Sequence, residues 1–287
     1  MAVDSCDARG LLSVVATPIG NLDDITLRGL ARLREADLVL AEDTRRTRKL
    51  LTHHGVTAKL KSLHAHSSDG VIERCLAELA DGKRLALVSD AGTPLISDPG
   101  AVLVERAIAA GAAVETIPGP TAVAAALSVC GLPFDSFRFA GFAPRSGARR
   151  RRWLERIAGS EEASVFFESP NRLAATLRDL ARLLPQAREV AVCRELTKLH
   201  EEVVRGTAQA LSELYADGAR GEITVVVGAG EAGGASTAAK PDLEALLRER
   251  LNAGMSARDA ARTVAEATGT ARRRVYALAQ QLTRPPR

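Results

Sequence analysis

The chain has 287 residues, 46% of them hydrophobic and 26% charged, and carries a formal net charge of +4. This length is sufficient for two globular domains, each with its own core. The N-terminus is polar and acidic, which is unlike a secretory signal, and no apolar run reaches the length of a membrane-spanning helix. We therefore expect a soluble, cytoplasmic protein.

The positive charge is concentrated in two segments. Residues 241–287 hold nine arginines against five acidic residues, and residues 145–156 hold six arginines against one glutamate. Such clusters favour a polyanionic partner. The four cysteines form no CxxC pair, and their spacing fits no zinc site. We expect neither structural disulfides nor a bound metal.

Strands and helices are predicted to alternate through the first 118 residues. The apolar pattern predicts strands at 11–16, 38–41, 60–63, 85–89 and 114–117, and helices at 27–35, 47–54, 70–80 and 102–110. This alternation is typical of a parallel, doubly wound sheet, whose functional loops lie at the carboxyl ends of the strands. We predict an N-terminal α/β domain over residues 11–118.

A hinge at Pro118-Gly119-Pro120 is predicted to lead into a second α/β domain over residues 119–229. Its helices are expected at 121–129, 173–184 and 208–215, and its strands at 138–141, 164–168, 189–194 and 222–228. Residues 230–240 are rich in Gly, Ala and Ser and are predicted to be a linker.

The segment 241–287 is predicted to be a basic helical extension. Helices are expected at 243–251, at 257–267 with Ser256 as the N-cap, and at 271–282. The last helix begins with three arginines after a short Gly turn, an order that resembles a helix-turn-helix.

The loops after the first and fourth strands are the first candidates for a ligand site. The loop TPIGN at 17–21 contains neither a GxGxxG fingerprint nor a Walker A motif, which disfavours redox nucleotides and NTP hydrolysis. An ordinary turn capped by Asn21 or Asp23 is an equal alternative there. The loop VSDAGTPLISDPG at 88–100 has small residues that let a ligand approach the backbone, with a rigid turn as the alternative.

Charged side chains follow three other strands. Glu42 and Asp43 are either acid–base groups or carboxylates at a helix N-terminus. His64 and His66 have no cysteine nearby and do not indicate a metal site. The segment RELTK at 194–198 is either functional or a solvated helix start. Four arginines at 149–152 follow a Gly/Ser loop and precede Trp153, which suits phosphate contacts better than a random surface does.

Together these motifs resemble one known family. The blocks that carry the resemblance are VVATPIGNLDDITLR, EDTRRT, SLHAHS, LVSDAGTPLISDPG, IPGPTA, LPFDSFRFAGFAPR, FFESPNR, CRELTKLHEE and GEITVVVG. They occur in the same order, from about Leu12 to Gly228, in the small-subunit ribosomal RNA methyltransferase I group of the tetrapyrrole methylase superfamily. Asn171 stands where the pattern has His, and Ser67 where it has Asn.

The resemblance implies a homodimer in which each chain has two α/β domains, with a parallel N-terminal sheet and a mixed C-terminal sheet. It implies that S-adenosylmethionine binds in the cleft between them and that the ribose 2′-OH of a cytidine in the decoding centre of small-subunit (16S) ribosomal RNA is methylated. The residues it assigns to the cofactor are Pro18, Asp90, Ala91, Gly92, Thr93, Ile96, Ser97, Thr121, Ala122, Phe167, Leu196 and Thr224.

Such a reaction benefits from a general base near the 2′-OH and from cations on the flanking phosphates. The unranked candidates for the base are Glu42, His64, Glu168 and Lys198, of which Lys198 must be neutralised by burial to accept a proton. The candidates for RNA contacts are Arg45, Arg149, Arg150, Arg151, Arg152, Arg172, Arg194, Arg272, Arg273 and Arg274.

Two alternatives remain open from the sequence. The first is a sister enzyme that methylates a small tetrapyrrole precursor, although such enzymes usually have a Gly-rich first loop and lack a basic tail. The second is a non-catalytic RNA-binding factor on the same scaffold, which would bind RNA without the cofactor.

Overall fold

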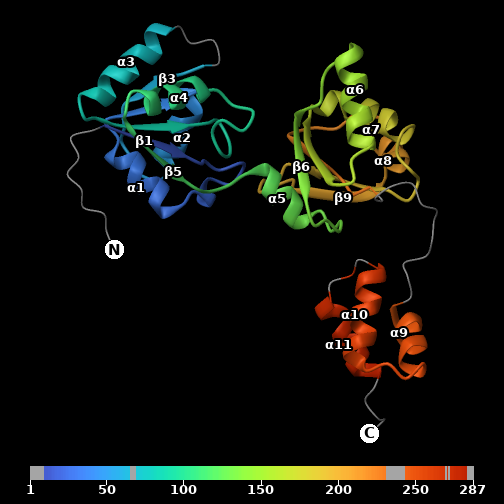
Figure 1. Ribbon diagram of the computed structural model, residues 1–287. Helices are drawn as coiled ribbons and strands as arrows, with labels where there is room; N and C mark the ends of the chain where they lie inside the picture. The colour runs from blue at the N-terminus through green and yellow to red at the C-terminus, as the bar shows by residue number, and fades with distance from the viewer. Residues whose placement is uncertain (1–9, 65–68, 231–242, 269, 271, 283–287) are drawn as a thin grey trace. The chain divides into compact units, whose positions relative to one another are not determined.

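The computed structural model describes residues 10–64, 69–230, 243–268, 270 and 272–282. The chain divides into two compact units, residues 1–230 and 231–287 (Figure 1). Predictions for Cys6, His66, Ser67 and most of the linker at 230–240 lie outside the described residues. No helix among the described residues is both long and apolar enough to cross a membrane.

The first half of the larger unit is a five-stranded parallel sheet, as predicted. Its strands are β1 (Leu11–Val15), β2 (Leu38–Ala41), β3 (Leu60–Ser62), β4 (Arg84–Val88) and β5 (Ala113–Ile117), in the order β3-β2-β4-β1-β5. The helices are α1 (Leu27–Glu35), α2 (Thr44–His53), α3 (Asp69–Ala80) and α4 (Ala101–Ala109), with the short 3-10 helix η1 (Leu22–Asp24) before α1.

Both faces of the inner strands β1, β2 and β4 are largely buried, which explains why these strands are mostly apolar. The edge strands β3 and β5 are only partly buried and contain Lys61 and Glu115. Along β4, Ala86 and Val88 pack in a core with α1 and α2, whereas Leu85 and Leu87 pack with α3 and α4 on the opposite face. This alternation follows from the two-residue period of a strand. Helix α2 begins three residues earlier than predicted because the Asp43 carboxylate accepts from the backbone N–H of Arg45 and caps it.

The second half is a mixed five-stranded sheet. Its strands are β6 (Phe137–Phe142), β7 (Ala163–Glu168), β8 (Glu189–Arg194), β9 (Glu202–Thr207) and β10 (Ile223–Val227), in the order β6-β7-β10-β8-β9. Only β6 and β7 pair in parallel in this sheet. Its helices are α5 (Ala122–Val129), α6 (Gly147–Ala158), α7 (Leu173–Ala181) and α8 (Ala208–Leu214), with η2 (Pro170–Arg172) before α7.

Two elements of this half were not predicted from the sequence. Strand β9 lies at the sheet edge and is only partly buried, so its apolar pattern is weak. In α6, the four consecutive arginines obscure the helical spacing of the three buried residues, which are Trp153, Leu154 and Ile157. The alternative of a helix start at 194–198 is wrong, because Glu195 and Thr197 adopt φ values of +52° and +64° in a tight turn.

Helix α5 and the first loop join the two halves. Val123 and Ala126 of α5 pack against one face of the second sheet, and Ile19 of the first loop belongs to the same buried cluster. Helices α6, α7 and α8 cover the other face, around Phe166 and Trp153. Because both sheets fall in one compact unit, the division into domains at residues 118 and 119 stays a prediction.

The described residues of the smaller unit form three helices, α9 (Leu243–Asn252), α10 (Ala257–Thr268) and α11 (Arg272–Leu282). Their shared core consists of six fully buried residues, Leu247, Ala260, Ala261, Val264, Val275 and Ala279. The Ser256 hydroxyl accepts from the backbone N–H of Asp259 at 3.1 Å, which confirms Ser256 as the cap of α10.

Candidate functional site

A backbone bridge ties the first loop to the fourth. Strands β1 and β4 are parallel neighbours, so their carboxyl ends open at the same edge of the sheet. There the backbone N–H of Thr17 donates to the Gly92 carbonyl, and the Gly92 N–H donates to the Thr17 carbonyl, both at 2.9 Å. The Thr17 hydroxyl also donates to the Ser89 carbonyl at 3.1 Å. The two loops therefore form one framework.

The bridge requires a glycine at position 92. Gly92 has a φ of +83°, and a Cβ built there would lie 3.4 Å from Cγ2 of Ile19. A residue with a side chain would be strained at this φ whatever space surrounds it. The same loop holds Leu95 and Ser97 at φ values of +72° and +70°. Non-glycine residues in this region carry strain and are concentrated at functional sites.

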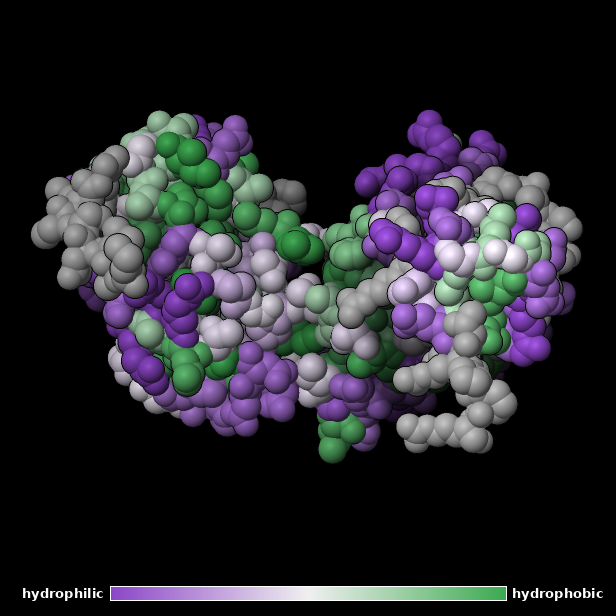
Figure 2. All heavy atoms as spheres, turned by 60° about the horizontal axis from the view of Figure 1, so that its bottom comes forward, coloured by the Kyte–Doolittle hydropathy of each residue, from purple (hydrophilic) through white to green (hydrophobic). Residues whose placement is uncertain are grey.

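The fourth loop forms one wall of a cavity of about 380 Å³. The opposite wall comes from the start of α5 and from the ends of β6, β7 and β10. In Figure 2, hydrophobic residues of both halves flank the hollow between them. The apolar lining is Ile19, Ile96, Phe142, Phe167 and Ile223. The rings of Phe142 and Phe167 lie edge to face with centroids 5.2 Å apart.

Ten of the twelve residues predicted to meet the cofactor line this cavity. They are Asp90, Ala91, Gly92, Thr93, Ile96, Ser97, Thr121, Ala122, Phe167 and Thr224. Pro18 lines a second cavity beside it. Leu196 lines neither and packs in the core near Ile19, so an adenine contact for Leu196 does not fit this arrangement. Phe142 and Ile19, which the sequence analysis did not select, line the cavity instead.

The second cavity has a volume of about 310 Å³ and lies between the first loop and α2. It shares Ile19, Arg46, Asp90, Ala91 and Glu222 with the larger cavity. Its remaining polar lining includes Lys49 and Lys198. The two cavities therefore adjoin across a wall that contains two carboxylates, of Asp90 and Glu222, and the guanidinium group of Arg46.

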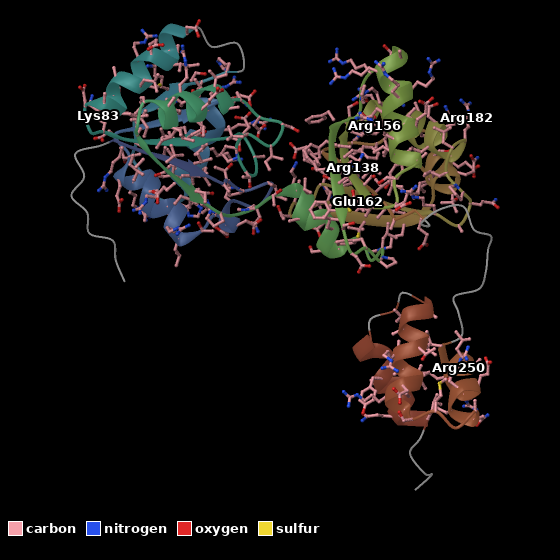
Figure 3. All side chains as sticks on the ribbon, in the orientation of Figure 1. Lys83, Arg138, Arg156, Glu162, Arg182 and Arg250 are labelled. Atoms are coloured by element: carbon pink, nitrogen blue, oxygen red, sulfur yellow. The ribbon has the colours of Figure 1, made fainter. Side chains whose placement is uncertain are left out.

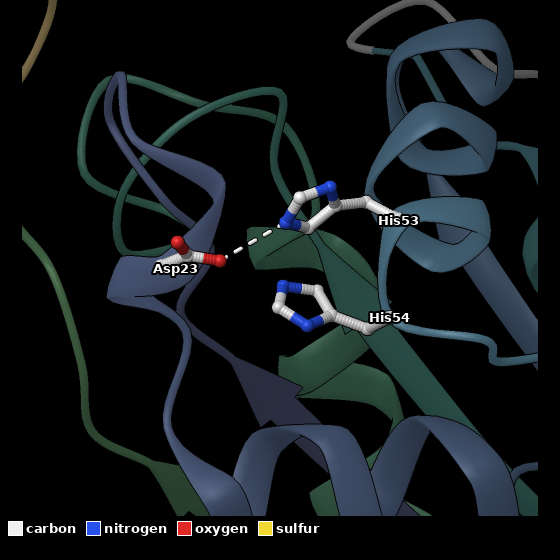
Figure 4. Close-up of side chains that lie close together, drawn as sticks. All are labelled: Asp23, His53 and His54. Carbon is white, nitrogen blue, oxygen red and sulfur yellow. Dashed lines mark hydrogen bonds and ion pairs between the residues drawn. The ribbon is translucent and has the colours of Figure 1, made fainter.

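Two histidines fasten the first loop to the end of α2 (Figure 4). His53 donates from Nε2 to Oδ1 of Asp23 at 3.0 Å, and His54 donates from Nε2 to the Leu22 carbonyl at 2.8 Å. The three side chains bring potential metal-ligand atoms within 4.8 Å of one another. Because both Nε2 atoms carry the donated proton, their lone pairs are not available to a metal in this arrangement. The group fixes a wall of the second cavity.

Glu168 and Lys198 line the cavities but are held by protein partners. The Glu168 side chain is fully buried and accepts from Arg172 at 2.6 Å, from the Thr176 hydroxyl at 2.5 Å and from the Ser169 N–H at 2.7 Å. Burial lowers the pKa of Lys198, but hydrogen bonds to Glu195 and Glu222 outweigh it and raise that pKa overall. Lys198 is therefore protonated at neutral pH, which argues against its predicted role as a base.

Glu42 and His64, the other two candidate bases, follow β2 and β3 and are not among the residues that line these two cavities. The Ser62 hydroxyl lies 2.7 Å from Nε2 of His64 and 3.2 Å from the Glu42 carbonyl, so it links the ends of the two strands.

Asp98 is a carboxyl group of the larger cavity that the sequence analysis did not select. Burial raises its pKa to about 6, with contributions from Glu42 and Asp90 that a hydrogen bond from Ser89 partly offsets. Glu42 and Asp98 are separated in the sequence by strands β3 and β4, so they could not be recognised as neighbours before the fold was known.

Four of the arginines predicted to bind RNA have partners within the protein. Arg45 pairs with Asp43 at 2.8 Å and lowers the pKa of that carboxyl group. Arg172 pairs with Glu168, and Arg194 pairs with Glu202 at 3.0 Å. Arg150 bonds Asp179, Thr176 and the Pro144 carbonyl, and only 13% of its side chain is exposed. A structural role therefore fits Arg150 better than an RNA contact does.

The exposed face of α6 carries the other arginines of this run. Arg149 and Arg152 line a broad depression of about 1010 Å³ together with Arg138 and Arg156. Figure 3 shows Arg138, Arg156 and Glu162 grouped on this half of the unit. Arg151 is exposed on the same helix. Arg272, Arg273 and Arg274 begin α11, and their side chains lie outside the described residues.

Two family models match the chain. The tetrapyrrole (corrin/porphyrin) methylases match residues 11–212, and the RsmI C-terminal HTH domain matches residues 237–283. The first match spans the parallel sheet, strands β6 to β9 of the second sheet and most of the residues that line the two cavities, and the second spans α9, α10 and α11.

Curated relatives extend over nearly the whole chain. The ribosomal RNA small subunit methyltransferase I of Xylella fastidiosa is 44% identical over 93% of this chain and 98% of that protein. The protein of the same name from Mycobacterium tuberculosis is 46% identical over 94% of each chain. That of Thermotoga maritima is 48% identical over 76% of this chain and 98% of its own length.

Solved structures show the same fold at low sequence identity. The cobalt precorrin-4 methyltransferase of cobalamin biosynthesis has a TM-score of 0.60 and 20% identity, over 79% of this chain and 98% of that one. The uroporphyrin-III-C-methyltransferase of Thermus thermophilus has a TM-score of 0.57 and 21% identity, over 77% and 94%. The chain therefore belongs to the tetrapyrrole methylase family, in the group of the ribosomal RNA small subunit methyltransferases I.

Proposed function

We propose that the protein methylates the ribose 2′-OH of a cytidine in the decoding centre of small-subunit (16S) ribosomal RNA. S-adenosylmethionine is the methyl donor used by methyltransferases of this family. The observation that carries the proposal is the cavity behind the Thr17–Gly92 bridge, in a chain whose relatives are named ribosomal RNA methyltransferases. We further propose that the protein is a cytoplasmic homodimer. Exposed Phe134 and Phe137, just before and at the start of the edge strand β6, support the dimer as apolar contact surface.

The residues around the larger cavity fit S-adenosylmethionine. Its volume falls within the range of about 300–1,000 Å³ that is typical of small-molecule sites. Phe142, Phe167 and Ile223 offer an apolar surface for the adenine, while Thr93, Ser97 and Thr121 offer hydroxyl groups for the polar end. The cofactor supplies an activated methyl group when bound. The protein's main contribution is then to position the ribose oxygen in line with it.

Asp98 is the carboxyl group best suited to accept the proton of the 2′-OH. A general base works best when its pKa lies near the working pH, and the pKa of Asp98 is about 6. Glu168 has its oxygens occupied by three donors, and Lys198 is held protonated by two carboxylates. Asp98 faces Glu42 and Asp90, both of which favour its neutral form, while Arg46 lies 3.8 Å from Asp90.

The arginines on the exposed face of α6 and at the start of α11 are proposed to hold RNA phosphates. Arg149, Arg152 and Arg156 recur at a spacing that places them on the same helix face. With Arg138 they give the depression four arginines against the three glutamates that also line it, Glu155, Glu161 and Glu162, and such cations suit phosphate contacts. The basic tail adds a second site of contact, through Arg272, Arg273 and Arg274.

The first prediction is methyl transfer from radiolabelled S-adenosylmethionine to 30S subunits taken from a strain that lacks this protein. The label should map to a cytidine 2′-oxygen. Cofactor binding without labelled RNA would instead support methylation of a small molecule. RNA binding without any cofactor binding would support the non-catalytic alternative.

The second prediction concerns Asp98→Asn. Turnover should fall at least about tenfold, and the acid limb of the kcat profile near pH 6 should disappear, because the amide cannot take up a proton. Affinity for S-adenosylmethionine should change little. Asp217→Asn, at an exposed position outside both cavities, should keep the wild-type profile.

The Asp98→Asn substitution should raise the stability of the folded protein while it lowers the activity. The pKa of Asp98 is above its ordinary value, so the folded protein loses stability as pH rises from about 4 to about 6. Above that window Asp98→Asn should be more stable than wild type by about 1–2 kcal/mol, and the difference should vanish below about pH 4. Denaturation at several pH values measures this. Normal turnover with an unchanged acid limb would rule out Asp98 as the base.

The third prediction separates RNA contacts from structural arginines on α6. The double variant Arg149→Ala/Arg152→Ala should weaken binding to 30S subunits and reduce the salt slope of the affinity by about 1–2, with stability unchanged. Arg150→Ala should instead lower stability by about 1–3 kcal/mol, because it removes the donor to the Pro144 carbonyl and leaves Asp179 with only the longer contact to Arg182 at 3.6 Å. Equal RNA affinity for the double variant and wild type would contradict the assignment of this face.

A further inference from the structure

The smaller cavity is built from one face of α2 and from the first loop. Arg46, Lys49 and Leu50 lie at positions i, i+3 and i+4 of the helix and share the face that lines it. The opposite wall is the backbone from Thr17 to Leu22. That wall is fixed at its far end by the bond from His54 to the Leu22 carbonyl, and the Asn21 N–H donates to the Thr197 hydroxyl at 3.1 Å. The cavity is therefore preformed.

Its positive charge is only partly neutralised. Lys198 is paired with Glu195 at 2.8 Å and with Glu222 at 3.0 Å. Arg46 has a long contact of 3.8 Å with Asp90, and 61% of its side chain is exposed. Lys49 makes no hydrogen bond or ion pair with any residue that the structure describes. Three cations, Arg46, Lys49 and Lys198, therefore line the cavity against two carboxylates, Asp90 and Glu222. Arg46 has only the long contact with Asp90, and this surplus of positive charge suits an anionic ligand.

The neighbouring larger cavity indicates which molecule carries the anion that binds in the smaller one. The shared wall contains Asp90 and Ala91 of the fourth loop. The larger cavity has the apolar surface proposed for the adenosine of the cofactor and the hydroxyl groups proposed for its polar end. A volume of about 310 Å³ is more than a carboxylate requires and lies at the low end for a small-molecule site. It suits one nucleotide unit, with its sugar toward the shared wall.

Building on the proposed function, we propose that this cavity receives the target nucleotide of the RNA, with Arg46 and Lys49 holding its phosphate. Arg46 reaches both chambers, so a phosphate bound there places the attached ribose beside the wall that separates substrate from cofactor. The methionine carboxylate of the cofactor is the other source of an anion for these two cations, and the two sources make opposite predictions.

The test compares Lys49→Ala and Arg46→Ala with Arg48→Ala. Arg48 lies on the same helix, is exposed, and lines neither cavity, so it removes the same charge outside the site. For the Lys49 and Arg46 variants, KM for 30S subunits should rise about tenfold, and the salt slope of kcat/KM should fall by about 1. Kd for S-adenosylmethionine, measured by calorimetry, should stay at the wild-type value. Lys49→Arg should restore most of the KM.

Cytidine 5′-monophosphate gives a second readout that does not depend on docking of the whole subunit. It should inhibit methylation competitively with the RNA, and its Ki should rise in Lys49→Ala but not in Arg48→Ala. Melting temperatures identify any variant that is simply unfolded, and in that case the Lys49→Gln protein takes its place.

Three results would overturn the assignment. These are a weaker Kd for the cofactor with unchanged KM for RNA, effects of equal size in Arg48→Ala, and a Ki for the nucleotide that none of the substitutions changes. Failure of the proposed function itself looks different, because the wild-type protein would then label no 30S subunits at all.

Discussion

The pair of backbone hydrogen bonds between Thr17 and Gly92 is the constraint on which the rest of the site depends. It joins two loops that are 75 residues apart in the chain and lie at the carboxyl ends of adjacent parallel strands. Ser89 reinforces it, since its hydroxyl donates to the Gly92 carbonyl at 3.0 Å. Thr93 extends it, since its hydroxyl donates to the Pro120 carbonyl at 3.2 Å, at the start of the second half. Both cavities are therefore walled by a backbone that is already ordered before any ligand binds, which reduces the entropy lost on binding.

Some charged side chains around this framework have full sets of protein partners, whereas others beside the cavities do not. Burial and, to a smaller extent, the nearby carboxylates of Glu42 and Asp90 raise the pKa of Asp98 beside the larger cavity, so its charged form is costly in the folded state. By contrast, Glu168 has three hydrogen-bond donors although it is fully buried. A carboxyl group that the protein leaves poorly stabilised beside a cavity is a better candidate for proton transfer than one it satisfies completely. The same contrast separates Lys49, which has no protein partner among the described residues, from Lys198, which has two.

The sequence predicted the features that repeat or that have a clear local cause. The apolar strands of the parallel sheet, the Ser256 cap and ten residues around the larger cavity follow from short patterns or from the motif order. It did not predict features that exist only through packing. Asp98 is a base candidate because burial, with a smaller contribution from Glu42 and Asp90, raises its pKa. Arg150 has a structural role because it pairs with Asp179 of α7. Leu196 was assigned to the cofactor by its place in a motif, whereas its side chain turns into the core. Strand β9 and helix α6 were missed because edge exposure and a run of arginines hide their apolar periods.

The most direct test of this account is calorimetric binding of S-adenosylmethionine to the wild-type protein, to Gly92→Ala and to Gly111→Ala. Both glycines have positive φ values, +83° and +78°, but a Cβ at Gly111 meets open space and lies outside both cavities. Each alanine should therefore cost about 1 kcal/mol or more of stability through backbone strain. Only Gly92→Ala should raise the Kd for S-adenosylmethionine, by about tenfold or more, because only this substitution disturbs the backbone bridge to Thr17. Equal affinity of Gly92→Ala and wild type, or no binding by the wild-type protein, would contradict the account.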